Sequence, residues 1–307
     1  MQWKQIKTLF ILCFLVLNIY LLVLLINKQD ESEYALPDTA ESSFEQQLES
    51  ENISISADLP EGDFDVPYVS LSQKSFTDDE LAFFEDLDNQ QAEVVNQHLI
   101  LSRFEEPVAI PEDADNRLIN ELVESRVLSP EHYTFGGWNK DMNVLIFFQQ
   151  QNELPIYYNY SGILLVYLND DNEMLFYTET MLDDDVSPSE EQSLIEPIKA
   201  IQALFDSNRL QSGDEITDVN MGFHTRIPLE SGEQVFSPTW TITVNDEANF
   251  YVNAIENLII SSDELTFLTG AVTNTIEKIQ EHDDDSELKA YMSAHLKDKL
   301  SMIQESE

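Results

Sequence analysis

The chain has little cysteine, glycine and positive charge. Its 307 residues include one cysteine (Cys13), eight glycines and 15 Lys+Arg, against 59 Asp+Glu. Because Cys13 lies in an apolar N-terminal stretch, the rest of the chain has no disulfide and must be stabilised by a packed core. The 17 Phe, 11 Tyr and 42% hydrophobic residues are sufficient for such a core. This composition argues against an animal secreted module and favours a bacterial surface protein.

The sequence also lacks the motifs of common catalytic and cofactor sites. It contains no P-loop, no G-x-S-x-G and no G-x-G-x-x-G pattern. No two histidines stand three or four residues apart, the spacing that places two imidazoles on one helix face, so no zinc site is expected. The five histidines are His98, His132, His224, His282 and His295. We therefore expect a non-enzymatic protein without a cofactor or a metal site.

Acidic runs at residues 170–171, 183–185 and 283–285 offer weak calcium ligands. None follows the EF-hand pattern, in which a glycine turns the loop and a distant glutamate closes it. We interpret these runs as solvated turns.

The positive and negative charges are unevenly distributed. Residues 29–307 carry all 59 Asp+Glu but only 12 Lys+Arg, a net charge of −47. Such a field repels nucleic acid and other polyanions, and it favours cations or a basic partner surface. The simpler interpretation, solvation at high salt or high pH, stays open beside it. In either case no nucleic-acid partner is expected.

The first 28 residues predict a membrane anchor. Residues 9–26 carry no charge and, at ~1.5 Å per residue, form a helix of about 27 Å, close to the thickness of a bilayer core. Lys4 and Lys7 precede this stretch, and Lys28 on its other side weakens the asymmetry, but acidic residues follow from Asp30. The balance favours a cytoplasmic N-terminus. The alternative, a cleaved signal peptide, has a shorter apolar region and ends in small residues. We expect a single-pass protein of the cell membrane, with residues 1–8 cytoplasmic, 9–28 in the membrane and 29–307 extracytoplasmic.

Asn18 lies near the middle of the predicted anchor. Its amide has no water to bond there, and a hydrogen bond to a second membrane helix is worth roughly 0.6–2 kcal/mol. We therefore predict that Asn18 contacts a partner helix. The alternative, that its amide bonds the backbone of its own helix, stays open.

The pattern of the remaining chain predicts an α+β protein. Residues 29–62 form an acidic stalk with one short helix, for which Ser42 and Glu45 have capping-box spacing. A helix followed by antiparallel strands then occurs twice, so we expect two lobes, residues 63–187 and 188–262, each with a helix packed on an antiparallel sheet. The expected helices cover residues 113–127, residues 188–208 and a segment that starts at Thr77. The expected strands cover residues 67–71, 94–104, 143–150, 154–159, 162–168, 173–182, 215–227, 238–244 and 249–260.

Residues 263–307 predict an acidic C-terminal extension of two helices, over residues 263–280 and 286–303. Each carries a narrow apolar stripe at helical spacing. The stripes favour packing on the protein's own body, and binding to a partner stays open.

Several segments match a known family in order. The chain begins with Trp3-Lys4-Gln5-Ile6-Lys7-Thr8-Leu9-Phe10-Ile11 and continues through Phe14-Leu15-Val16-Leu17-Asn18. It later contains Ala203-Leu204-Phe205, Asp214-Glu215-Ile216-Thr217-Asp218-Val219, Gly222-Phe223, Ser237-Pro238-Thr239-Trp240 and Tyr251-Val252-Asn253-Ala254. Over about residues 2–262 this set resembles the YycI (WalI) family.

The resemblance implies a regulator rather than an enzyme. Family members are anchored by one helix and form a heterodimer with a related anchored protein, YycH (WalH). The pair acts on the WalK (YycG) sensor histidine kinase, largely through transmembrane contacts, and so tunes cell-wall metabolism. The family has no catalytic residues to carry over. Residues 240–244 and 251–254 also resemble the closing hairpin of PepSY-type modules, so an extracytoplasmic binding or protease-inhibiting module is the alternative. The simpler interpretation of Trp240 is a core residue.

Overall fold

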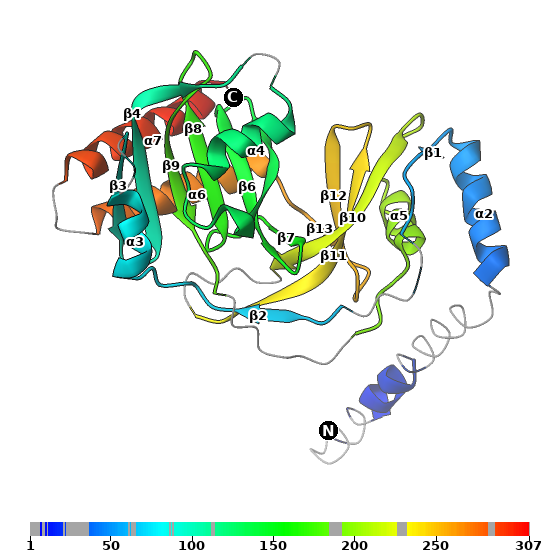
Figure 1. The fold of residues 1–307 in the computed structure, drawn as a ribbon. Coiled ribbons are helices and arrows are strands. Elements are labelled where there is room, and N and C mark those ends of the chain that lie inside the picture. The colour runs from blue at the N-terminus through cyan, green and yellow to red at the C-terminus, as the bar shows by residue number, and fades with distance from the viewer. Residues whose placement is uncertain are drawn as a thin grey trace. The chain divides into compact units, whose positions relative to one another are not determined.

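The computed structural model of the chain describes residues 7, 10, 12–20, 22, 37–60, 62, 66–85, 87, 89–111, 114–183, 192–225, 232–281 and 286–306 (Figure 1). Residues 1–54 and 210–215 form one compact unit, and residues 55–209 and 216–307 form a larger one. The predicted division into lobes at residue 187 and the predicted stalk boundaries stay predictions.

The smaller unit contains helical residues 12–20 and helix α2 (Pro37–Ser50). The short helix expected in the stalk is therefore present, but it begins at Pro37, and the predicted cap Ser42 lies inside it. Proline suits a first helical turn, because the amide hydrogen that it lacks has no partner there. Asn52, at φ 57°, ends the helix in the left-handed region, and the Ile53 N–H donates to Leu48 O at 2.9 Å.

The predicted anchor lies only partly within the described residues. Residues 9, 11, 21 and 23–28 are outside them, and residues 12–20 are helical. Within the part of the chain that the structure describes, no helix is long and apolar enough to cross a membrane. The anchor stays a prediction from sequence.

The described strands form a 13-stranded sheet. Along its main path the order is β13-β12-β11-β10-β7-β6-β8-β9-β4-β3, while β2 pairs with β11 and β5 with β6. The strands are β1 (Ser54–Ile55), β2 (Val69–Leu71), β3 (Gln90–Val95), β4 (Leu99–Ala109), β5 (Tyr133–Asn139), β6 (Val144–Gln151), β7 (Leu154–Tyr157), β8 (Ile163–Leu168), β9 (Glu173–Thr180), β10 (Glu215–Thr225), β11 (Gln234–Val244), β12 (Ala248–Asn253) and β13 (Ile259–Ile260).

Strand β7 joins two groups of strands. It pairs with β6 over two residue pairs and with β10 over two more, and the β7–β10 pairing is parallel. The other pairings of the main path are antiparallel, which confirms the expected strand type away from this junction. Gly222 of β10 lies here, and a Cβ on it would overlap the Tyr157 ring and stand 2.8 Å from Pro155 O. The close approach of the two strands therefore requires glycine at this position.

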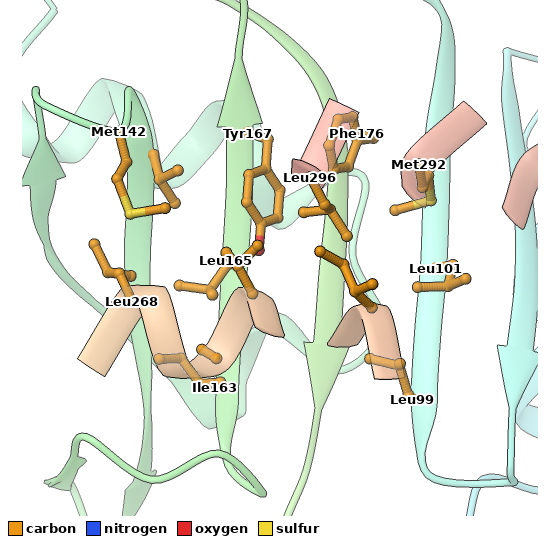
Figure 2. Close-up of a cluster of buried hydrophobic side chains, with 14 of the residues drawn as sticks. Leu99, Leu101, Met142, Ile163, Leu165, Tyr167, Phe176, Leu268, Met292 and Leu296 are labelled. Carbon is orange, nitrogen blue, oxygen red and sulfur yellow. The ribbon is translucent and has the colours of Figure 1, made fainter. Parts of the chain in front are cut away.

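Helices cover both faces of the sheet half built from β3 to β9. On one face α3 (Asp78–Glu85) and α4 (Asn116–Glu124) contribute Phe84, Ile119 and Val123 to a buried apolar cluster. On the other face α6 (Glu264–Gln280) and α7 (Glu287–Ser306) pack over β4, β8 and β9. Figure 2 shows Leu268 and Leu296 from these helices among the side chains of the strands. The interpretation that the C-terminal stripes pack on the protein's own body is therefore confirmed.

Local capping explains where the helices of this half begin. Asp115 accepts a hydrogen bond from Leu118 N at 2.8 Å before α4, and Asp263 accepts one from Thr266 N at 2.7 Å before α6. Thr77 and Glu80 form a capping box at α3, with the Thr77 N–H 2.9 Å from Glu80 Oε2. These starts agree with the prediction from sequence to within a few residues.

Three predicted elements were wrong in extent. The single strand expected over residues 249–260 is two paired strands, β12 and β13. Helix α5 (Pro197–Asp206) begins at the proline that was expected to bend a longer helix from residue 188, and residues 192–196 are not helical. The physical reason is that proline lacks the donor for an intrahelical bond and disfavours helix at the residue before it. The single strand expected over residues 94–104 is a hairpin, β3 and β4, with a turn at Asn96 and Gln97.

Candidate functional site

The predicted site residue Asn18 bonds within its own helix. Its Nδ2 donates to Phe14 O at 2.9 Å, one turn earlier. This is the geometry of the alternative interpretation, but the bond uses only one of the two amide donors and leaves the side-chain carbonyl as an acceptor. The predicted contact between Asn18 and a partner helix stays a prediction.

The acidic runs that could offer metal ligands lie only partly within the described residues. Among the described residues no group of three or more His, Cys, Asp or Glu could hold a metal ion. In the turn at residues 169–172, Asn169 Oδ1 accepts from Asp171 N at 3.0 Å and Glu173 N at 2.9 Å, so this turn is stabilised by its own hydrogen bonds. His282 and residues 184–185 and 283–285 lie outside the described residues.

Trp240 lies in the core. Its side chain is fully buried, and its Nε1 donates to Ile195 O at 2.9 Å. Trp240 pairs with Val252, so these residues lie in one antiparallel hairpin, formed by β11 and β12. The position of Trp240 agrees with the simpler interpretation of a core residue.

A buried polar cluster was missed by the sequence analysis. Glu179 lies on β9, between β4 and β8, and is fully buried. Its Oε2 accepts a hydrogen bond from Leu128 N at 3.4 Å. Its Oε1 has no hydrogen-bond partner among the described residues. The Tyr133 hydroxyl lies beside it and donates to Thr180 O at 2.9 Å. The Tyr177 hydroxyl donates to Arg126 O at 2.9 Å. These contacts tie the segment between α4 and β5 to the sheet.

Burial dominates the electrostatics of this cluster. Desolvation raises the pKa of Glu179 to about 8, although the Leu128 N–H and the Tyr133 hydroxyl act in the opposite direction. Desolvation also raises the pKa of Tyr133 and of Tyr177 well above the ordinary tyrosine value, with the neighbouring Glu179 as the second cause. Both tyrosines therefore stay neutral while Glu179 titrates near neutral pH.

A cavity of about 480 Å³ lies next to the cluster. Gln90 and Arg126 line it together with apolar side chains that include Leu87 and Phe104. Gln90 Nε2 donates to Ser102 Oγ at 2.6 Å and to Arg126 O at 2.8 Å, so this wall is held by the buried cluster.

The fold is thus a mixed α+β architecture, a large sheet covered by helices. One family model, described as YycI protein, matches residues 33–255, and the chain belongs to the YycI family, which is a family of regulatory proteins. The resemblance found in the sequence is confirmed. Helices α6 and α7 lie beyond the matched residues.

The solved structures that match the chain include two with low sequence identity. An uncharacterized protein from Eubacterium rectale matches with a TM-score of 0.42 and 9% identity, over 69% of this chain and 91% of that protein. YycH from Bacillus subtilis matches with a TM-score of 0.37 and 14% identity, over 65% of this chain and 54% of YycH. No curated protein sequence matches the chain significantly.

Proposed function

We propose that this chain is a membrane-anchored, non-enzymatic regulator of a WalK (YycG)-type sensor histidine kinase. It works as a heterodimer with a YycH (WalH)-like anchored protein and tunes cell-wall metabolism. The observation that carries the proposal is the YycI family match over residues 33–255. The uncharged stretch at residues 9–26 is preceded by Lys4 and Lys7 and followed by Lys28 and then by Asp30, Glu31 and Glu33. The balance of these charges supports an anchor with the acidic body outside the cell.

In this proposal the anchor is the part that acts on the kinase. A regulator can shift a kinase between its two signalling conformations only if it binds one of them more tightly than the other. A helix that packs beside the kinase's own membrane helices can bind the two conformations with different affinity. The extracytoplasmic body pairs with the YycH-like protein and so brings the anchor to the kinase.

Exchanging the anchor tests the proposal. We expect that replacing residues 9–26 by an unrelated membrane helix abolishes most of the effect on kinase autophosphorylation in reconstituted vesicles. Residues 1–62 alone should keep a large part of that effect, because they retain the anchor. Residues 29–307 added as a soluble fragment should have little effect. A soluble fragment as active as the whole chain would contradict the proposal and favour the PepSY-like binding module.

Asn18→Leu tests the polar contact within the anchor. If Asn18 bonds a partner helix, we expect its replacement to weaken co-purification with the kinase or the YycH-like protein about three- to thirty-fold, the equivalent of roughly 0.6–2 kcal/mol. Tyr20→Phe, which also removes a polar group from the anchor, is the matched control and should change little. Unchanged co-purification for Asn18→Leu would show that the bond to Phe14 O, at 2.9 Å, satisfies the amide.

A further inference from the structure

Strand β3 forms one edge of the described sheet. It is the last strand in the order, and among the described residues it pairs only with β4. Alternate residues of an edge strand direct their N–H and C=O groups away from the sheet. At ~3.3 Å per residue, the six residues of β3 present such groups over about 20 Å.

This edge has few of the features that protect sheet edges from pairing. Natural edges are shortened, carry lysine or proline, or point charges inward. The sequence of β3 is QQAEVV, without lysine or proline, and its one charged residue, Glu93, is paired with Lys289 at 2.5 Å. At the opposite end of the sheet β13 has only two residues, which is one of the usual protections.

An apolar groove runs along the open edge. Its volume is about 370 Å³, and residues 90–94 of β3 line it together with Leu81 and Phe84 of α3. Leu81, Ala92 and Val94 are half-buried and belong to the same apolar cluster, so the groove continues the α3 face of the core. An added strand would place every second side chain in this groove.

The charge of α3 decides which kind of partner suits the groove. The sequence of α3, DDELAFFE, has four acidic residues and no lysine or arginine. The adjacent Lys74 already binds Glu80 at 3.0 Å, and on the other face of β3 Glu93 is held by Lys289 and by Ser286 Oγ at 2.6 Å. Helix α3 therefore brings a net negative charge to this side of β3. A second copy of this chain would bring its own acidic α3 against it and be repelled.

We propose that β3 and α3 form a docking site for an extended, basic segment of another protein. The segment adds as a strand to the open edge of β3 and places alternate apolar side chains against Leu81 and Phe84. Its lysine or arginine residues are attracted to the acidic residues of α3. The site is a property of this chain's body and does not depend on an action on a kinase.

Peptide binding to the full-length protein in nonionic detergent tests the site. The probe is a fluorescein-labelled nine-residue peptide that alternates lysine and valine, followed by anisotropy. We expect saturable binding and slower hydrogen exchange at the amides of β3. The double variant Asp78→Lys/Asp79→Lys should bind about tenfold more weakly, because it reverses the charge beside the groove. The matched control Asp170→Lys/Asp171→Lys has the same net charge and should bind like the unmodified protein.

Three outcomes would overturn the proposal. A peptide N-methylated at alternate valines cannot pair as a strand, so equal binding of that peptide would exclude strand addition. Equal loss of binding in both double variants would show attraction to the overall charge only. Protection of β3 that increases with protein concentration and without peptide would assign the edge to a second copy of this chain.

Discussion

A chain that ends at Ser262 is expected to lose the cooperative unfolding of the larger unit. It would keep every residue that the YycI family model matches, but it would lack α6 and α7. These helices bury a stripe against β4, β8 and β9, so their removal exposes both the stripe and the face of the sheet beneath it (Figure 2). The stripe consists of Phe267, Leu268, Ala271, Val272, Ile276, Ile279, Leu288, Met292, Leu296 and Ile303.

The expected loss of unfolding free energy exceeds the stability of an ordinary domain. Each large apolar side chain that is fully buried contributes about 1.5–3 kcal/mol, while a whole domain is stable by only about 5–15 kcal/mol. Polar contacts add to the apolar ones: Lys299 Nζ donates to Leu168 O at 2.8 Å in a buried position, and the Arg103 guanidinium lies 3.8 Å from the centre of the Tyr291 ring. These contacts fix the register of α7 on the sheet.

Circular dichroism and urea unfolding check this prediction. The chain that ends at Ser262 should show a broad transition and aggregate, whereas deletion of residues 304–307 should leave the unfolding midpoint nearly unchanged. The single variants Leu268→Ala and Met292→Ala should still fold, and each should lower the free energy of unfolding by about 2–5 kcal/mol. A truncated chain with the midpoint of the whole protein would show that the two helices are an accessory arm, as in the alternative of a partner-binding extension.

Periodic apolar residues were enough to predict most of the elements. Strands β6, β8 and β9 and helices α6 and α7 follow from patterns that a few neighbouring residues determine. Strand β5 was missed because Gly136 and Gly137 interrupt its alternation. The pairing of β5 with β6 shifts register between Phe135 and Gly137, and Gly137 has φ 150°, so the glycines mark a bulge inside the strand.

The hairpin of β3 and β4 shows a second limit of the sequence pattern. Its turn places Asn96 and Gln97 at φ 53° and 63°. Asparagine often adopts the left-handed region, but glutamine seldom does, so the two residues do not resemble a common hairpin turn. Long-range pairing with β9 stabilises β4 and holds the turn in this conformation.

The buried cluster could not be predicted from the sequence for a different reason. Its members come from β3, from the segment after α4 and from β9, so that Gln90, Arg126 and Tyr177 are distant in sequence. The chain contains 59 Asp+Glu, and in so acidic a sequence a single buried carboxylate such as Glu179 does not stand out. The local sequence gives little indication, because Glu179 stands between Thr178 and Thr180 in β9, after the apolar residues 174–177.

Glu179→Gln is expected to remove a large part of the pH dependence of stability between about pH 4.5 and pH 8. Burial raises the pKa of Glu179 from 4.5 to about 8 in the folded protein. A raised carboxyl pKa means that the folded state binds the proton more tightly than the unfolded state does. Its stabilising contribution is therefore complete below the unfolded pKa and is lost as the pH rises through the folded pKa.

The size of this change in stability follows from the pKa shift of Glu179. One unit of pKa corresponds to about 1.4 kcal/mol, so ionisation of Glu179 should cost the unmodified protein on the order of 4 kcal/mol across this window. Glutamine has nearly the same shape and carries no charge at any pH. The variant should thus match the unmodified protein near pH 4.5 and be the more stable of the two at pH 8.5.

Urea unfolding at a series of pH values measures this difference. The other carboxylates also repel one another more as the pH rises, so the informative quantity is the difference in unfolding free energy between the two proteins. Glu124→Gln, which removes an exposed carboxylate from α4, is the matched control and should follow the unmodified protein closely. The pKa values of Tyr133 and Tyr177 are raised well above this pH range. The two tyrosines therefore add nothing to the change of unfolding free energy with pH here. Parallel curves for Glu179→Gln and the unmodified protein would mean that Glu179 is ionised in the folded state, with a compensating partner close to its Oε1.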